Sequence, residues 1–492
     1  MNLIPLLLVI PLAWALISLL FPRWPLGPIA VVGMLIQLVA SALLWRSVQL
    51  DGATRYAIGD WMAPLGITLV ADGLTVTLLA MTALIAIICA CYALIYLRAH
   101  PHEKRYFWPL FWFLLASLNG IWLAGDLFNL YVGLELVTLA AVGMVTLSGN
   151  RAALAAGLRY LYAALLGSLG YLLGVALLYS AYGTLDMQQL GGLMENNWTT
   201  QAALLLMTLG LLVKTAIFPF HLWLPPAHGG ALAPVSALLS ALVVKSSFYI
   251  LARLWLDAGS DLLPVLGAQL LGLLGACAIF YGGFKALQQK EIKMLVAYST
   301  VAQLGYLMLI FPLATGTSAH ATMLAWQGGM LHLVSHAFAK AAMFLSVGTL
   351  VLAVGSKQIS ALAGISTRIP LSLFAFGLAG VSLMGLPPSG GFNAKWLMLQ
   401  SAMTSGQWHW VLVLSLGSLL TATYIFKVFR VSFDQEAIEQ GRGLVDRAHW
   451  GMELSALLLA MIAIGLGFAA ALPVELLSLP QADPAMLPEV IE

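Results

Sequence analysis

The sequence predicts an all-α polytopic membrane protein with about 14 transmembrane helices. Of the 492 residues, 61% are hydrophobic and only 9% are charged, whereas a typical soluble domain carries about 25% charged residues. A transmembrane helix needs about 20 predominantly apolar residues, and runs of this kind follow one another along the chain. We therefore expect a single membrane domain whose surface mostly faces lipid.

Each expected span is an apolar run of the sequence. The first is interpreted as a retained helix, because no small-residue cleavage site follows a short apolar core. The fourteen runs begin near Leu3, Leu26, Leu74, Tyr106, Leu127, Ala153, Gln201, Leu232, Leu262, Met294, Ala321, Ile369, Trp408 and Trp450. The last residues, "LSLPQADPAMLPEVIE", predict a short acidic tail.

The basic residues of the expected loops predict the orientation, because cytoplasmic loops are enriched in Lys and Arg. One side of the membrane holds Arg23, Arg98, Lys104, Arg105, Arg151, Arg159, Lys285, Lys290, Lys293, Lys357, Arg368, Lys427, Arg430, Arg442 and Arg447. The other side holds only Arg46, Arg55 and Arg253. We expect a multi-pass protein of a bacterial cell (inner) membrane, with both termini on the non-cytoplasmic side.

Five ionisable residues lie inside expected spans, which is unusual for a membrane helix. They are Glu135, Lys214, Lys245, Lys340 and Lys395. A charge at the centre of a helix costs roughly 2.5–3.5 kcal/mol on insertion scales. One such residue is readily explained by snorkelling or by a structural ion pair. Five of them favour a chain of groups that passes protons through the membrane.

Two expected spans are interrupted by proline. In "LLLMTLGLLVKTAIFPFHLWLPPAHGG", Lys214 precedes Pro219 and Pro225. In "AGVSLMGLPPSGGFNAKWLM", Pro387 and Pro388 precede Lys395. Interrupted spans at corresponding places in two halves are typical of inverted-repeat transporters. The alternative is a pair of unrelated proline kinks.

Histidines provide further candidates. His332 and His336 precede Lys340 at intervals of four residues, so all three lie on one helical face, and histidine titrates near neutral pH. The spacing of the two histidines also suits zinc, but no Glu follows the first as a metalloprotease requires, so we expect no metal. His228 either tunes the link to the next span or sits in a loop.

The remaining candidates are weaker. Tyr298 and Gln303 either hydrogen-bond inside the second half or simply pack there. Asp72 either lines an ion entrance or begins a helix. No Walker-type or dinucleotide-binding motif occurs, and the net charge is only +2. We therefore expect no cofactor and no nucleic-acid partner.

Five motifs resemble one known family. They are "LVKTAIFPFHLWLPPAH", "PVSALLSALVVKSSFYILAR", "KEIKMLVAYSTVAQLGY", "HLVSHAFAKAAMFL" and "GLPPSGGFNAKW". Together they are similar to the antiporter-like subunits, which include the proton-pumping membrane subunits of respiratory complex I, related hydrogenase subunits and Mrp-type Na+/H+ antiporter subunits. The stretches "ITLVADGLTV" and "GDLFNLYVGLEL", like the chain length, most resemble the D-type subunits of Mrp antiporters.

The resemblance implies two inverted five-helix repeats, each with one broken helix. The chain then divides into helices 1–3 (about residues 1–105), helices 4–8 (106–255), helices 9–13 (262–432) and helix 14 (450–473). The resemblance also implies partners, namely the other membrane subunits of an antiporter or a complex I-like assembly. It makes Lys245 the station after Lys214, and Lys395 the terminal lysine.

A lysine–carboxylate pair explains how such a chain works. The pKa of a lysine falls on burial and rises again beside a carboxylate. We therefore expect Glu135 and Lys214 to form a pair whose opening releases a proton.

The leading interpretation is the proton-translocating subunit of an Mrp-like Na+/H+ antiporter, with H+ and Na+ as the ions and no catalytic chemistry on this chain. One alternative is a proton-pumping subunit of a complex I-like or hydrogenase complex, which would make the chain part of a translocase enzyme. Another is the membrane subunit of an inorganic-carbon uptake complex. A scaffold with an inactive channel fits the five buried charges least well.

Overall fold

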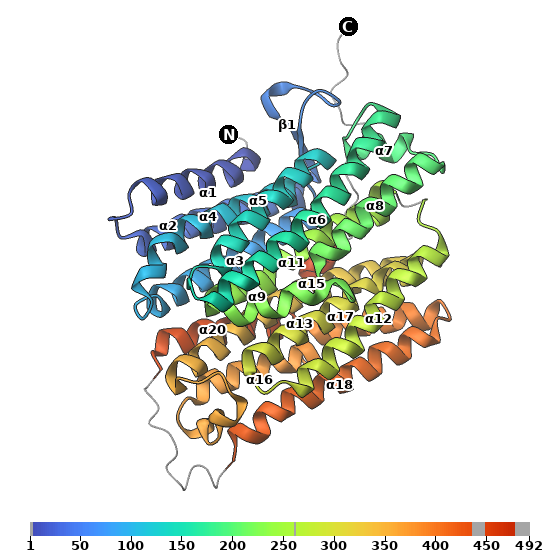
Figure 1. The fold of residues 1–492 in the computed structure, drawn as a ribbon. Helices are drawn as coiled ribbons and strands as arrows, with labels where there is room; N and C mark the ends of the chain where they lie inside the picture. The colour runs from blue at the N-terminus through green and yellow to red at the C-terminus, as the bar shows by residue number, and fades with distance from the viewer. Residues whose placement is uncertain (1–2, 260–261, 435–447, 478–492) are drawn as a thin grey trace.

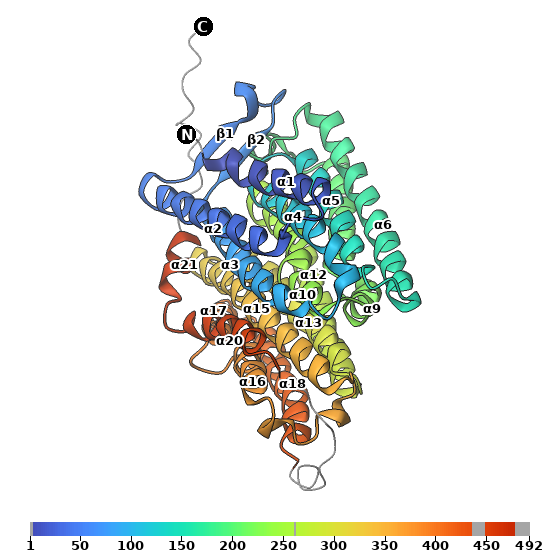
Figure 2. The same ribbon diagram turned by 90° about the vertical axis from the view of Figure 1, so that its left-hand side faces the viewer.

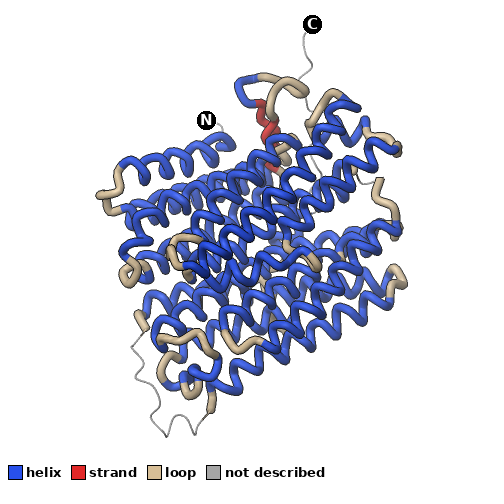
Figure 3. Tube along the Cα trace, viewed as in Figure 1, coloured by secondary structure: helices blue, strands red, loops and turns tan. Residues whose placement is uncertain are grey.

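The computed structural model describes residues 3–259, 262–434 and 448–477, and these are almost entirely helical (Figures 1 and 3). The helices run side by side along one common direction, as expected for a polytopic membrane protein. Arg442, Arg447 and the expected acidic tail from residue 478 onward lie outside the described residues.

The N-terminal part consists of α1 (Leu3–Leu20), α2 (Leu26–Asp51) and α3 (Gly73–Tyr96). A short antiparallel hairpin, β1 (Thr54–Ala57) and β2 (Thr68–Ala71), connects α2 to α3. We did not predict a hairpin there from the sequence. α1 packs against α4 and α2 packs against α3 (Figure 2).

The rest of the chain supplies the remaining spans. The first part comprises α4 (Pro101–Leu123), α5 (Leu127–Val145), α6 (Arg151–Tyr182), α7 (Met187–Leu193), α8 (Trp198–Thr215), η2 (Phe220–Trp223), α9 (Leu224–Gly230), α10 (Ala233–Leu238), η3 (Leu239–Val243), α11 (Val244–Arg253) and η4 (Leu254–Ala258). The second part comprises α12 (Val265–Gln288), α13 (Ile292–Met308), α14 (Ile310–Ala314), α15 (Ala319–Val354), α16 (Pro370–Met384), α17 (Gly390–Thr404), α18 (Trp408–Ser432), α20 (Trp450–Gly465) and α21 (Ala471–Leu477).

The prediction of an all-α polytopic membrane protein is confirmed. In the described part, 12 helices are long and apolar enough to cross a membrane. The two other expected spans correspond to the shorter apolar helices α16 and α20. α16 is short because the helix stops at Met384 and resumes as α17 at Gly390.

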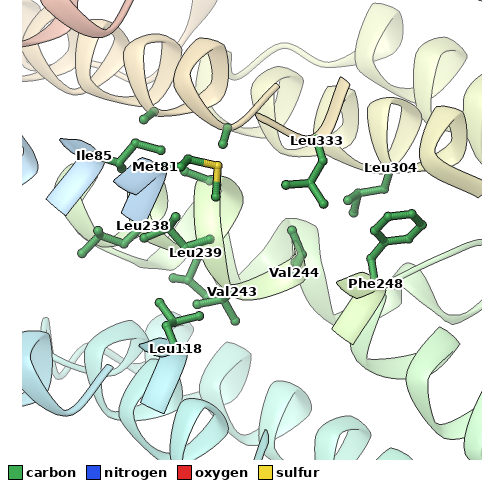
Figure 4. Close-up of a cluster of buried hydrophobic side chains, with 14 of the residues drawn as sticks. Met81, Ile85, Leu118, Leu238, Leu239, Val243, Val244, Phe248, Leu304 and Leu333 are labelled. Carbon is green, nitrogen blue, oxygen red and sulfur yellow. The ribbon is translucent and has the colours of Figure 1, made fainter. Parts of the chain in front are cut away.

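The span formed by α10, η3 and α11 occupies the centre of the protein. Residues 233–255 of this span are all buried. Helices α3, α5 and α15 all pack against the span. Figure 4 shows part of this apolar packing, in which Val243, Val244 and Phe248 meet side chains such as Leu118 and Leu333. A polar side chain on this span is therefore surrounded by the rest of the protein and not by lipid.

The two described ends of the chain lie on the same side. The Asn119 side chain donates to the Leu7 carbonyl at 2.9 Å, and α4 ends beside β2. The C-terminal helix α21 packs against α3, whose first residue follows β2. We call this side the hairpin face. The opposite side, to which most loop cations belong, is the basic face.

Two cations assigned to loops are in fact buried. Arg253 ends α11, where its guanidinium pairs with Asp72 and with Asp257 at 3.1 Å. Lys293 lies in the first turn of α13 and donates to the Ala231 carbonyl. The loop assignments were wrong because the sequence does not reveal that neighbouring helices cover these positions.

Asp72 is the N-cap of α3, where its carboxylate accepts the Thr75 amide at 2.8 Å. Burial raises the pKa of the Asp72 carboxyl, but the Arg253 guanidinium and the Thr75 amide hold that pKa below its ordinary value. The contribution of this pair to stability is therefore complete near neutral pH, and it is lost as the pH falls through the lowered pKa.

Close helix contacts depend on glycine. A Cβ atom on Gly210 of α8 would lie 2.2 Å from the Gly167 carbonyl oxygen of α6. Small residues allow this approach, which is common between membrane helices.

We predict that Gly210→Ala destabilises the protein by roughly 1–3 kcal/mol, because the backbone contact leaves no room for a methyl group. The matched control is Gly192→Ala in α7, where no atom lies within 4 Å of the new Cβ. Thermal unfolding in detergent measures both. Equal unfolding temperatures would contradict the inferred α6–α8 contact.

Candidate functional site

Glu135 and Lys214 meet between α5 and α8. The Lys214 Nζ lies 3.5 Å from Glu135 Oε1, and the side chain of Lys214 is 5% exposed and that of Glu135 is 21% exposed. The Ser168 hydroxyl of α6 donates to the Glu135 carboxylate. Lys214 also donates to the Thr138 hydroxyl at 3.0 Å. Helices α5, α6 and α8 thus converge on one ion pair.

The break after Lys214 determines its position. α8 ends at Thr215, and Ala216 adopts a left-handed conformation with φ of 58°. Lys214 therefore lies in the last turn of α8, where a cation interacts favourably with the helix dipole. The Trp223 indole donates to the Val213 carbonyl at 2.9 Å, and the Ala216 amide donates to the same carbonyl at 3.2 Å. Pro219 lies in the break and Pro225 in the first turn of α9.

A small cavity of about 10 Å³ lies beside Lys214. It has room for about one water molecule. Its lining comprises Leu134, Val137, Thr138, Tyr160, Lys214, Val243, Ser246 and Ser247. The last three belong to the central span that also carries Lys245, and the Thr215 hydroxyl donates to Ser247 at 2.9 Å. The cavity therefore connects the surroundings of Lys214 with the central span.

Lys245 is completely buried in the central span. Its Nζ donates to the Ser240 carbonyl at 2.7 Å. Ser240 belongs to η3, a π-helical turn, and such turns are frequent at functional sites. The Ser240 hydroxyl shares a hydrogen bond of 2.9 Å with the Thr300 hydroxyl of α13.

Lys340 reaches the same region of α13 from α15. Its Nζ donates to the Val296 carbonyl at 3.2 Å and to the Ser299 hydroxyl. The Thr300 hydroxyl also donates to that carbonyl, at 3.1 Å. Polar groups of η3 and α13 therefore join the surroundings of Lys245 to those of Lys340.

His332 and His336 stack on one face of α15, with ring centroids 5.7 Å apart and planes within 6°. His332 Nε2 lies 3.3 Å from the Gln303 carbonyl. Neither ring nitrogen of His336 has a hydrogen-bond partner among the described residues. The helical face expected from the four-residue spacing is therefore buried inside the protein.

Lys395 follows the break between α16 and α17. Its Nζ donates to the Leu383 carbonyl at 2.8 Å and to the Ser418 hydroxyl at 3.0 Å. It also lies 4.2 Å from the ring centroid of Tyr306. The Leu383 carbonyl accepts the Gln303 amide as well, at 3.3 Å. Pro387 and Pro388 lie in the break itself, between Met384 and Gly390.

The remaining candidates are dispersed. Tyr298 is half-buried, and its ring packs against the edge of the core. Asp72 lies on the hairpin face with Arg253. His228 is not in a loop, because it lies inside α9 with its ring stacked on Phe344 at 4.7 Å.

Several hydroxyl groups of the site escaped the sequence analysis. They are Thr138, Ser168, Ser240, Ser299, Thr300 and Ser418. Ser299 and Thr300 stand directly after Tyr298 in the motif "AYSTVAQLGY", from which only Tyr298 and Gln303 were selected as candidates. Hydroxyl side chains are common in membrane helices. Only the contacts between helices show that these six belong to the candidate site.

Comparison with known proteins shows to which family the chain belongs. Residues 124–421 match the family described as "NADH:quinone oxidoreductase/Mrp antiporter, TM". The protein belongs to this family, as the resemblance predicted. The matched region extends from the end of α4 into α18 and includes every lysine of the buried series.

Individual relatives come from both branches of the family. The chain is 38% identical to the N subunit of the NADH-quinone oxidoreductase of Desulforudis audaxviator, over 77% of this chain and 75% of the relative. It is 30% identical to the D subunit of the Na+/H+ antiporter of Alkalihalophilus pseudofirmus, over 94% of this chain and 91% of the relative.

Two solved structures share the fold. A chain of the Mrp complex from Dietzia sp. superimposes with a TM-score of 0.88 at 24% identity, covering 96% of this chain and 95% of that chain. A chain of an archaeal membrane-bound sulfane sulfur reductase superimposes with a TM-score of 0.87 at 26% identity, covering 96% of each chain. The fold therefore occurs in both antiporter and respiratory assemblies.

Proposed function

We propose that this chain is the proton-translocating subunit of a multisubunit Mrp-like Na+/H+ antiporter. The observation that carries the proposal is the series of buried groups from Glu135 to Lys395 across both broken helices. The similarity to the antiporter relative, which extends over 94% of this chain, supports the choice of complex. The proposed partners are the other membrane subunits, H+, Na+ and the surrounding lipid.

The Glu135–Lys214 pair is the proposed switch. At a separation of about 3.5 Å and an effective dielectric constant near 20, the attraction is roughly 4–5 kcal/mol. Opening the pair removes this attraction and leaves a buried ammonium without a carboxylate, a state that favours loss of its proton. The adjacent water-sized cavity gives the released proton a way towards the central span.

The later steps use neutral oxygen atoms. Among the described residues, Lys245, Lys340 and Lys395 have no carboxylate within 4 Å, and each donates to a backbone carbonyl instead. A backbone carbonyl stabilises an ammonium group less than a carboxylate does. Each of these lysines therefore releases its proton to the next group more easily. His332 and His336 lie on the same helix face as Lys340 and are proposed to carry protons towards Lys395.

We further propose that α4 to η4 and α12 to α18 are the two inverted repeats. Each repeat crosses the membrane an odd number of times, so equivalent helices of the two halves run in opposite senses. In support of this, each half contains one broken helix with a buried lysine close to the break. The basic face is proposed to be cytoplasmic, which places both termini outside.

A proton-pumping subunit of a respiratory complex is the second candidate function. The 38% identity to a quinone oxidoreductase relative favours it. The same lysine series would then be driven by redox chemistry on other subunits. Purification of the native complex distinguishes the two, because the partners are either further antiporter subunits or subunits with redox centres.

We predict that Glu135→Ala and Lys214→Ala each abolish proton transport by the reconstituted complex. The double variant should be no worse than either single variant, because the two residues act as one switch. Assembly of the complex, measured by gel filtration, should stay intact in all three. Substantial transport by either single variant would place the switch elsewhere, with Lys245 as the next candidate.

A second prediction concerns the position of Lys395. A Cβ on Gly385 would lie 2.8 Å from Lys395 Cδ, whereas a Cβ on Gly406 meets nothing within 4 Å, and both glycines have positive φ. Gly385→Ala and Gly406→Ala should therefore lose similar stability, because each carries the same backbone strain. Only Gly385→Ala should lose transport, because the added methyl group displaces the flexible Lys395 side chain from the Leu383 carbonyl. Equal transport by the two variants would contradict a positional requirement for Lys395.

A further inference from the structure

The buried ion pair of Asp72 and Arg253 takes no part in the series from Glu135 to Lys395. The Arg253 guanidinium lies between two carboxylates, those of Asp72 and Asp257. The side chain of Asp257 is 26% exposed, whereas that of Asp72 is 10% exposed and that of Arg253 is 6% exposed. The pair therefore lies at the boundary between the hairpin face and the protein interior.

Arg253 stands two helical turns beyond Lys245 on the central span. Lys245, Tyr249 and Arg253 follow one another at intervals of four residues in α11, so they share one side of this helix. Eight residues of α-helix place Arg253 about 12 Å nearer to the hairpin face than Lys245. The Lys245 ammonium reaches the other way, because it donates to the Ser240 carbonyl. Tyr249 and Arg253 therefore stand between Lys245 and the hairpin face.

Tyr249 connects the ion pair to α4. Its hydroxyl donates to the Trp122 carbonyl at 3.0 Å and accepts the Nε–H of Arg253 at 3.2 Å. The Trp122 ring packs edge-on against the Tyr249 ring, with centroids 5.1 Å apart. The Trp122 carbonyl also accepts the Thr75 hydroxyl of α3 at 3.0 Å. Side chains thus tie α3, α4 and α11 together at this level, and the Tyr249 hydroxyl and the Trp122 carbonyl both have protein partners.

We propose that Asp72, Tyr249 and Arg253 form a seal at the hairpin-face end of the central span. This inference rests on the proposed function. Arginine does not release its proton in proteins, so Arg253 passes no proton on. Its fixed positive charge also opposes the entry of protons and cations from water at the hairpin face. Asp72 holds the guanidinium in this position from α3. Protons on Lys245 are thereby left with the route towards Lys340.

A simpler role for the pair is to hold α3 against α11. Arg253→Lys distinguishes the two roles, because lysine keeps a positive charge for Asp72 but readily changes its pKa on burial and releases its proton. If the pair is only structural, the substitution changes the unfolding temperature alone. If the pair is a seal, the substitution also lets protons pass.

The experiment measures the passive proton leak of vesicles that contain the intact complex, with a pH difference across the membrane and no Na+ on either side. Asp72→Asn and Arg253→Lys should each raise the leak roughly tenfold or more, because a fixed guanidinium no longer opposes the entry of protons. Adding Lys245→Ala to either variant should return the leak to the wild-type level, since the leak passes through Lys245.

The matched control is Asp186→Asn, which changes another ion pair of the hairpin face. Asp186 pairs with Arg55 at 2.8 Å, and the two residues belong to the cap of α7 and to β1 rather than to the central span. This variant should show the wild-type leak.

A wild-type leak in both Asp72→Asn and Arg253→Lys would overturn the seal and leave the pair as a structural contact. A raised leak that persists after Lys245→Ala would overturn it equally, since the protons would then cross elsewhere. If Asp72→Asn does not assemble, Arg253→Lys decides the question alone. The leak is passive and needs no Na+, so its outcome is separate from that of the proposed function, which fails if the wild-type complex shows no Na+/H+ exchange.

Discussion

Each buried ammonium group in this protein needs an oxygen atom, and irregular helices supply most of them. A regular helix uses its carbonyls internally, so it offers a buried lysine few oxygen atoms; Lys340 is the exception, because it donates to a carbonyl and a hydroxyl of α13. The π-helical turn provides the Ser240 carbonyl for Lys245, and the break after α16 provides the Leu383 carbonyl for Lys395. The end of α9 does the same for Lys293. The breaks and the π-helical turn are therefore binding sites for the lysines.

Among the described residues, Lys214 differs from the other buried lysines because it has a carboxylate partner. Opening an ion pair changes the electrostatic interaction energy by a large amount. Breaking a hydrogen bond from an ammonium group to a carbonyl changes the interaction energy less. This difference is the reason for proposing Lys214 as the switch and the later lysines as transfer groups. The central span links these two sets of lysines, because it borders the cavity beside Lys214 and also carries Lys245.

The sequence predicted the spans, both breaks and the charged members of the site, because these leave direct signals: apolar runs, prolines and charges inside apolar runs. It did not predict the hydroxyls of Ser240, Ser299 and Thr300, because their roles depend on how η3, α13 and α15 pack. It also misplaced Arg253 and Lys293 in loops, since a cation near a span end looks the same in sequence whether a neighbouring helix covers it or not. The β1–β2 hairpin was missed altogether.

Protons are proposed to pass through Lys245 between the two halves of the protein. The most direct test is the proton transport rate of the complex carrying Lys245→Arg. Arginine retains a positive charge able to donate to the Ser240 carbonyl, but it cannot release a proton. We expect a fully assembled complex without proton transport. An assembled Lys245→Arg complex that transports protons near the wild-type rate would contradict a proton route through Lys245.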